Sequence, residues 1–122
     1  MGRKFWATDF LQMCSSGKVR EAFSRYVALG FKHHNPNFPG DAQSLMDGMI
    51  SAARQSPTQT FEVQRAIEEG ELVAVHSRVT PAPGGPSLAV VHILRFENER
   101  VVELWDVVNQ VPEKPVNANG VF

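Results

Sequence analysis

The stretch that decides the fold is ELVAVHSRVTPAPGGPSLAVVHILRFENERVVELWDVVNQ, residues 71–110. Runs rich in valine and other apolar or β-branched residues predict three long strands, at 71–80, 87–97 and 100–110. The segment 81–86 between the first two is built of proline, glycine and alanine and cannot lie inside a strand. Asn98-Glu99 makes a tight turn before the last strand. The stretch therefore predicts an antiparallel meander.

The residues before this meander have mostly helical patterns. Apolar side chains recur at helical spacing, Gly17 and Gly30 end the first two runs, and Asp41 caps the third. The predicted helices are 5–14, 18–29 and 41–55, and the predicted extended segments are 31–35 and 60–68. Helices followed by a meander predict a single α+β domain over 1–122, with N-terminal helices packed on a curved, mostly antiparallel sheet. Residues 112–122 are expected to form an irregular C-terminal tail.

Composition limits the classes of partner. The net charge is −1 and basic residues never run longer than the pair Arg3-Lys4, so no nucleic-acid partner is expected. No apolar stretch approaches the roughly 18 residues of a membrane span, so no membrane partner is expected either. Cys14 is the single cysteine and lies in an apolar helical pattern, which favours a buried structural thiol over a reactive one. These features indicate a cytoplasmic protein.

The strand predicted at 87–97 is apolar on both faces. Leu88, Val90, Leu94 and Phe96 alternate with Ala89, Val91 and Ile93. A strand that is apolar on both faces needs cover on its second face. The simplest cover is a second copy of the same sheet, so the pattern predicts a homodimer.

Three polar residues stand where the strand pattern calls for apolar ones: His76, His92 and Asp106. A hairpin symmetric about the loop at 81–86 is expected to make His76 the cross-strand neighbour of His92, although a slip of one residue would separate them. The following turn sets Trp105 opposite His92, and a bulge there would set Asp106 in that place instead. The predicted cluster thus holds both histidines with one or more of Glu103, Trp105 and Asp106.

Imidazoles beside a carboxylate can act as general acid and base on a small organic substrate near neutral pH. The histidines could equally be structural, satisfied by the backbone or by each other. Zinc is a third interpretation, but no His-Glu-x-x-His or cysteine-based pattern occurs, and of the adjacent His33 and His34 only one can join the cluster. No metal and no cofactor are therefore expected. No phosphate-binding glycine loop precedes a helix.

Four segments together resemble the SnoaL-like proteins of the nuclear-transport-factor-two-like superfamily: His34-Asn35-Pro36, residues 71–76, residues 88–97 and residues 101–107. The resemblance runs from Phe5 to Phe122, and the closing stretch is similar to a bacterial subgroup of predicted aldol-condensation enzymes. It implies a cone-shaped α+β barrel with a deep pocket, dimeric through the sheet. It also implies cofactor-free chemistry, in which an acidic residue removes a proton beside a carbonyl and a histidine assists.

By position, the assisting histidine corresponds to His76, and His92 stands where relatives usually carry aspartate. The expected enzyme uses His92 as general base on a small apolar or carbonyl-containing compound, held by His76 or Asp106. His34 and Asn35 are expected to bind the substrate oxygen. The pocket wall is expected to include Trp105, Phe31, Phe96 and Phe38. The alternative is a non-catalytic ligand-binding or dimerisation module with the same pocket.

Overall fold

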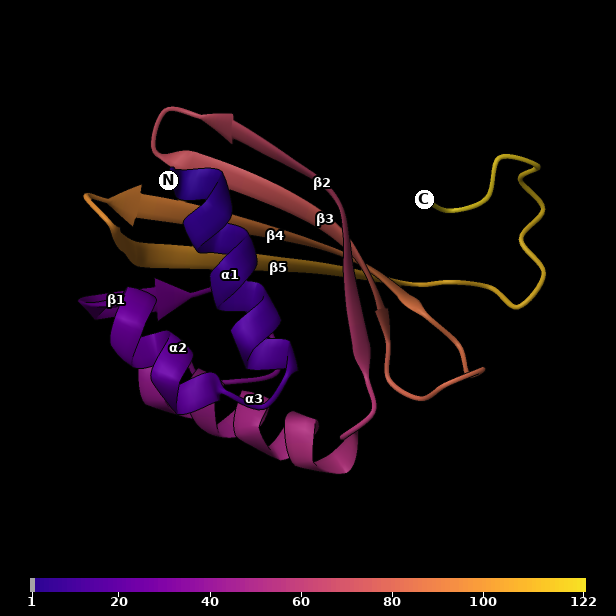
Figure 1. Ribbon diagram of the computed structural model, residues 1–122, viewed down its shortest axis with the longest axis horizontal. Helices are drawn as coiled ribbons and strands as arrows, with labels where there is room; N and C mark the ends of the chain where they lie inside the picture. Colours follow the sequence, from indigo (N-terminus) through magenta and orange to yellow (C-terminus); the bar gives the residue numbers. More distant parts are fainter. Residues whose placement is uncertain (1) are drawn as a thin grey trace.

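The computed structural model describes residues 2–122, which form three helices and one sheet (Figure 1). In chain order the elements are α1 (Arg3–Ser15), α2 (Val19–Tyr26), β1 (Val27–His33), α3 (Ala42–Gln55), β2 (Thr60–Glu69), β3 (Leu72–Thr80), β4 (Leu88–Glu97) and β5 (Arg100–Gln110). The sheet order is β1-β5-β4-β3-β2, and only β1 lies parallel to its neighbour. The three helices lie on one side of the curved sheet. The predicted α+β architecture is confirmed.

Strand alternation divides the sheet into an inner face under the helices and an outer face. On β4 every second residue from Val90 to Phe96 is buried, and the residues between them are partly exposed. Of this buried set, Leu94 and Phe96 pack in one core with apolar residues of α1 and α3, Phe10 and Leu45 among them. The inner face therefore carries the core, and the cavity described below opens at one end of it.

The boundary between α2 and β1 differs from the prediction. The helix ends at Tyr26 and the strand begins at Val27, whereas the sequence predicted helix to residue 29. Val27 pairs with Val101 of β5, and Gly30 takes a positive φ of 78° within an irregular part of that pairing. Pairing with the sheet outweighs the local helical pattern of residues 27–29.

The predicted pairing of His76 with His92 is wrong by one residue. The hairpin is symmetric about the Pro83–Gly84 bond, and that symmetry pairs His92 with Val75 and His76 with Val91. Because side chains alternate along a strand, a shift of one residue places the two histidines on opposite faces. His92 lies on the inner face and His76 on the outer face.

The second hairpin follows the bulged alternative. The register shifts between Arg95 and Phe96, and beyond this bulge His92 pairs with Asp106 while Trp105 pairs with Ile93. Asp106 is thereby the inner-face partner of His92, and Trp105 lies on the outer face.

The segment 111–122 contains no helix or strand and returns to the outer face of β3. The Phe122 ring stacks on His76, with ring centroids 5.8 Å apart, and the Arg78 guanidinium lies 4.2 Å from the Phe122 centroid. The tail thus covers part of the outer face and does not close the cavity under the helices.

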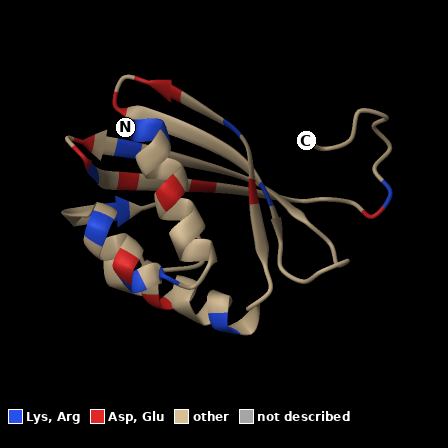
Figure 2. Ribbon diagram, viewed as in Figure 1, with Lys and Arg blue, Asp and Glu red and all other residues tan. Residues whose placement is uncertain are grey.

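Charged side chains of both signs are spread over the molecule. Lys and Arg are interspersed with Asp and Glu along the helices and at the strand ends (Figure 2). Among residues 2–122, no helix combines the length and the apolar character needed to cross a membrane.

The sidedness of the fold can be tested with two leucines. Leu94 is fully buried on β4, whereas Leu29 on β1 is fully exposed. We expect Leu94→Ala to lower the free energy of unfolding by about 2–5 kcal/mol, because it leaves a cavity in the core. Urea titration measures this change, and Leu29→Ala is the matched control. Equal effects of the two substitutions would contradict the assignment of the inner face.

Candidate functional site

A cavity of about 290 Å³ lies between the inner face of the sheet and the C-terminal halves of α1 and α3. Its polar lining includes His92, Asp106 and Asn35. Most of its wall is apolar and comes from both helices and four strands, including Leu11, Met49, Phe61, Val79, Leu88 and Val90. Ligand pockets are commonly apolar with a few placed polar groups and measure ~300–1,000 Å³, so this cavity suits a small organic molecule.

The central pair of the site is His92 and Asp106. They are cross-strand partners on β4 and β5, and their side chains are only 10% and 8% exposed. Nε2 of His92 lies 2.7 Å from Oδ1 of Asp106. The bond holds the imidazole in one orientation and satisfies the buried carboxylate, which would otherwise be costly to bury.

The Asp106 carboxylate has a second partner from the loop after β1. Nδ2 of Asn35 donates to Oδ2 of Asp106 at 2.8 Å. Oδ1 of the same amide accepts from the backbone N–H of Asn37 at 2.9 Å, which sets which end of the amide faces the carboxylate. One amide hydrogen of Asn35 remains for another acceptor.

These contacts keep Asp106 ionised. Burial alone would raise the pKa of Asp106, but hydrogen bonds and charge from His92, together with the Asn35 amide, hold it below its usual range. The site therefore presents a fixed carboxylate against one nitrogen of the imidazole.

The other ring nitrogen of His92, Nδ1, is buried and has no hydrogen-bond partner among the described residues. If Nε2 carries the proton donated to Asp106, Nδ1 holds the lone pair and can accept a proton. Ser77 Oγ is also buried and unpartnered among residues 2–122, and Ser77 lies diagonal to His92 on the inner face. Ser77 is a polar residue in an apolar strand, the same signal that identified His76, but it was not among the predicted site residues.

The remaining predicted site residues lie elsewhere. His76 is on the outer face beside Phe122, and a very short contact joins its Nδ1 to Arg65. Trp105 and His34 stack on one another with centroids 5.1 Å apart, and Trp105 is on the outer face by its pairing with Ile93. The structure therefore brings together His92, Asp106 and Asn35 but not His76, Trp105 or His34.

The predicted aromatic wall is also different. Phe31 and Phe96 are buried in the core, where Phe31 packs on Phe23 and Phe96 on Trp6, and neither lines the cavity. Phe38 packs close to Gly48 of α3. The aromatic wall is supplied by Phe61 of β2, whose ring centroid lies 6.1 Å from that of His92.

A separate ionic network surrounds Glu103 on the outer face. Oε2 of Glu103 lies 2.6 Å from Nε2 of His34, and Oε1 accepts from Nε of Arg95 at 3.1 Å. The His34 hydrogen bond, with help from Arg95 and Lys32, lowers the pKa of Glu103 despite its partial burial. This network lies on the outer side of β5, on the face opposite Asp106.

Cys14 lines the cavity, but its thiol is not reactive. Burial raises the pKa of the Cys14 thiol to about 12, so it does not supply a thiolate near neutral pH. Within residues 2–122, no three His, Cys, Asp or Glu side chains are grouped in a way that could hold a metal ion.

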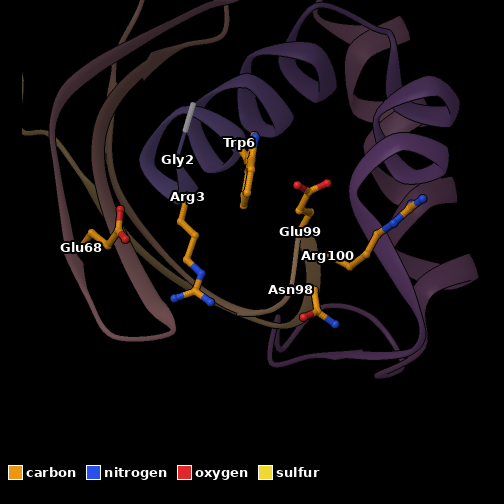
Figure 3. Close-up of a pocket in the computed structure, with 7 residues that line it drawn as sticks. All are labelled: Gly2, Arg3, Trp6, Glu68, Asn98, Glu99 and Arg100. Atoms are coloured by element: carbon orange, nitrogen blue, oxygen red, sulfur yellow. The ribbon is translucent and has the colours of Figure 1, made fainter.

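A larger groove of about 670 Å³ lies at the opposite end of α1 (Figure 3). Trp6 stands between charged side chains of both signs there, including Arg3, Glu68 and Arg100. Both arginines already donate to backbone carbonyls, Arg3 to Gly70 and Arg100 to Ser24. The groove holds none of the predicted site residues, so the inner cavity is the candidate site.

The ionised state of Asp106 gives a pH prediction. Because the pKa of Asp106 is lowered on folding, its stabilising contribution is present above the unfolded value of about 3.9 and is lost as pH falls through the folded value. We expect Asp106→Asn to lower the melting temperature near pH 7, with the deficit shrinking as the pH falls below about 4. Thermal melts across this range measure the difference, and Asp47→Asn on the exposed side of α3 controls for the lost charge. A deficit that does not change with pH would contradict the prediction.

Comparison with known proteins agrees with the fold. An uncharacterised cystatin-fold protein of Novosphingobium aromaticivorans matches with a TM-score of 0.72 and 19% identity, over 88% of this chain and 98% of its own. IdmH of Streptomyces antibioticus, described as a candidate polyketide cyclase, matches with a TM-score of 0.69 and 17% identity, over 88% and 93%. A candidate isomerase of the SnoaL-like family from Agrobacterium tumefaciens matches with a TM-score of 0.71 and 13% identity, over 89% and 99%.

No protein with a curated description matches the chain. The family model described as the SnoaL-like domain matches residues 7–104, from within α1 to within β5. Asn35 and His92 lie inside the match, and Asp106 lies just beyond it. The fold and this match together place the chain in the SnoaL-like domain family.

Proposed function

We propose that this protein binds a small carbonyl compound in the inner cavity and moves a proton on it without a cofactor. The observation that carries the proposal is the His92–Asp106 pair, bonded at 2.7 Å and set into an otherwise apolar cavity. A positioned imidazole with one nitrogen fixed by a carboxylate is a general base suited to neutral pH.

In the proposed reaction, Nδ1 of His92 takes a proton from the carbon beside the substrate carbonyl. The electron pair of that C–H bond moves to the carbonyl oxygen and forms an enolate. The Asp106 carboxylate, bonded to Nε2–H, stabilises the resulting imidazolium, and the free amide hydrogen of Asn35 donates to the enolate oxygen.

Two outcomes can follow from the enolate. If His92 returns the proton to a different carbon of the enolate, the reaction is an isomerisation. Attack of the enolate carbon on a second carbonyl, with His92 giving its proton to the new alkoxide, gives an aldol addition. The descriptions of IdmH as a candidate cyclase and of the Agrobacterium tumefaciens protein as a candidate isomerase support this range.

Substitution of His92 tests the proposal directly. We expect His92→Ala to lower turnover by roughly 10²–10⁴-fold, because it removes the base and leaves the cavity walls in place. The measurement is exchange of α-protons for deuterium in a panel of enolisable ketones and aldehydes, followed by NMR. His76→Ala should exchange at the wild-type rate, because its ring lies on the opposite face of the sheet.

A non-catalytic role is the second candidate, favoured by the strongly apolar cavity wall. It predicts that a small ligand binds, and that its binding weakens when Phe61 is shortened to alanine, with no α-proton exchange in any compound of the panel. Measurable exchange that depends on His92 would exclude this candidate.

We also propose that the protein is a homodimer through the outer face of the sheet. Large apolar side chains are exposed there on three strands: Ile67 is 63% exposed, Leu72 42% and Val107 58%. Large apolar side chains exposed on a sheet face favour association with a second copy.

A charge in this face tests the dimer. We expect Val107→Glu to weaken dimerisation by more than about 100-fold, because an unpaired carboxylate would be buried at the interface. Sedimentation equilibrium measures the association, and Val116→Glu in the tail, at a fully exposed position, is the matched control. A wild-type protein that sediments as a monomer at micromolar concentration would refute the proposal.

A further inference from the structure

His33 is a buried histidine that the proposed reaction does not use. It lies at the end of β1 with 5% of its surface exposed, and both of its ring nitrogens are bonded. Nε2 lies 2.7 Å from the carbonyl oxygen of Pro39, and Nδ1 lies 3.1 Å from the backbone nitrogen of Asn35. Both partners belong to the loop that carries Asn35 to the cavity.

The two partners define the protonation state of the ring. A carbonyl oxygen can only accept, so Nε2 of His33 must donate to Pro39. A backbone N–H can only donate, so Nδ1 must hold a lone pair to accept from Asn35. These bonds therefore require the neutral imidazole with its proton on Nε2.

The bond to Asn35 continues into the site. Asn35 is held at its backbone by His33 and at its side-chain oxygen by Asn37, and its side-chain nitrogen donates to Asp106. Asp106 in turn holds Nε2 of His92. An unbroken chain of hydrogen bonds thus runs from His33 through Asn35 and Asp106 to His92.

We propose that His33 is a positioning residue of the site, which holds Asn35 against Asp106 only while its ring is neutral. A proton on Nδ1 would point at the Asn35 N–H, remove that bond and release the loop. The inference rests on the proposed function for its effect on catalysis, because the released residue is the one that donates to the substrate oxygen.

The charged groups that face His33 come from neighbouring elements. A charge on the His33 ring would interact with the carboxylates of Asp41, at the start of α3, and Asp106, on β5. The bond from the Asn35 N–H requires a lone pair on Nδ1 of His33. Lys32 on the same strand and His34 directly after it are paired with Glu103, away from Asp41 and Asp106.

The first test uses the wild-type protein without any ligand. Proton–nitrogen correlation spectra of isotope-labelled protein distinguish the two neutral tautomers of each histidine. We expect His33 in the Nε2–H form, and on acidification we expect the backbone and side-chain amide signals of Asn35 to shift with the midpoint of His33. The Nδ1–H form, or Asn35 signals that follow His34 or His92 instead, would overturn the proposal.

The second test compares two substitutions of similar polarity. In His33→Asn the side-chain oxygen replaces Nδ1 as acceptor for Asn35, whereas in His33→Gln the amide replaces only the Nε2 donor to Pro39. We expect His33→Gln to lower the rate of α-proton exchange by about 10–100-fold through misplacement of Asn35. We expect His33→Asn to retain the wild-type rate and to lose the acidic inflection that belongs to His33.

Equal losses in both variants would count against the proposal, because a purely structural histidine would not separate them. The tests also separate this inference from the proposed function. If the Asn35 signals follow His33 and no carbonyl compound exchanges its protons, the positioning chain stands and the proposed reaction fails. If α-proton exchange depends on His92 but the Asn35 amide signals do not follow the titration of His33, the proposed reaction stands and the positioning role fails.

Discussion

The β-bulge between Arg95 and Phe96 is the constraint on which the site depends. Ahead of it Phe96 pairs with Val101, and beyond it Arg95 pairs with Glu103, so that one residue of β5 is left without a partner. That single extra residue turns Asp106 inward to His92 and Trp105 outward to His34. Without the bulge, an indole would face the imidazole and the carboxylate would lie on the opposite face. The polar pair, its low-pKa carboxylate and the outer network around Glu103 all follow from this register.

The cavity also shows how a polar pair is kept inside an apolar fold. Each buried polar group needs a partner, and Asp106 obtains one from β4 and one from the loop after β1. That loop is itself held by a histidine of β1 and by the parallel pairing of β1 with β5. The short edge strand therefore helps to set the geometry of the site.

Much of the fold could be predicted from the sequence, because it depends on patterns that are local. The valine-rich strands, the proline-rich loop and the third helix capped by Asp41 are each determined by residues that lie close together in the sequence. The site was harder, because it depends on register, and a shift of one residue exchanges the faces. His92, Asp106 and Asn35 could be predicted as site residues, but the predicted position of His76 was wrong by one residue, and Trp105 and Asp106 remained alternatives. His34 rather than His33 was expected at the site, since two adjacent histidines on a strand give no local sign of which one points inward.

Adjacent residues of β5 serve two separate environments, with Trp105 on the outer face and Asp106 on the inner one. A substitution on one face can therefore leave the other face undisturbed. Changes of length are a different matter. An inserted or deleted residue between the bulge and Asp106 would exchange the contents of the two faces at once, placing the indole in the cavity and the carboxylate on the outer surface. This part of β5 therefore tolerates replacement of residues but not insertion or deletion, and natural variation in it should be confined to changes of residue type.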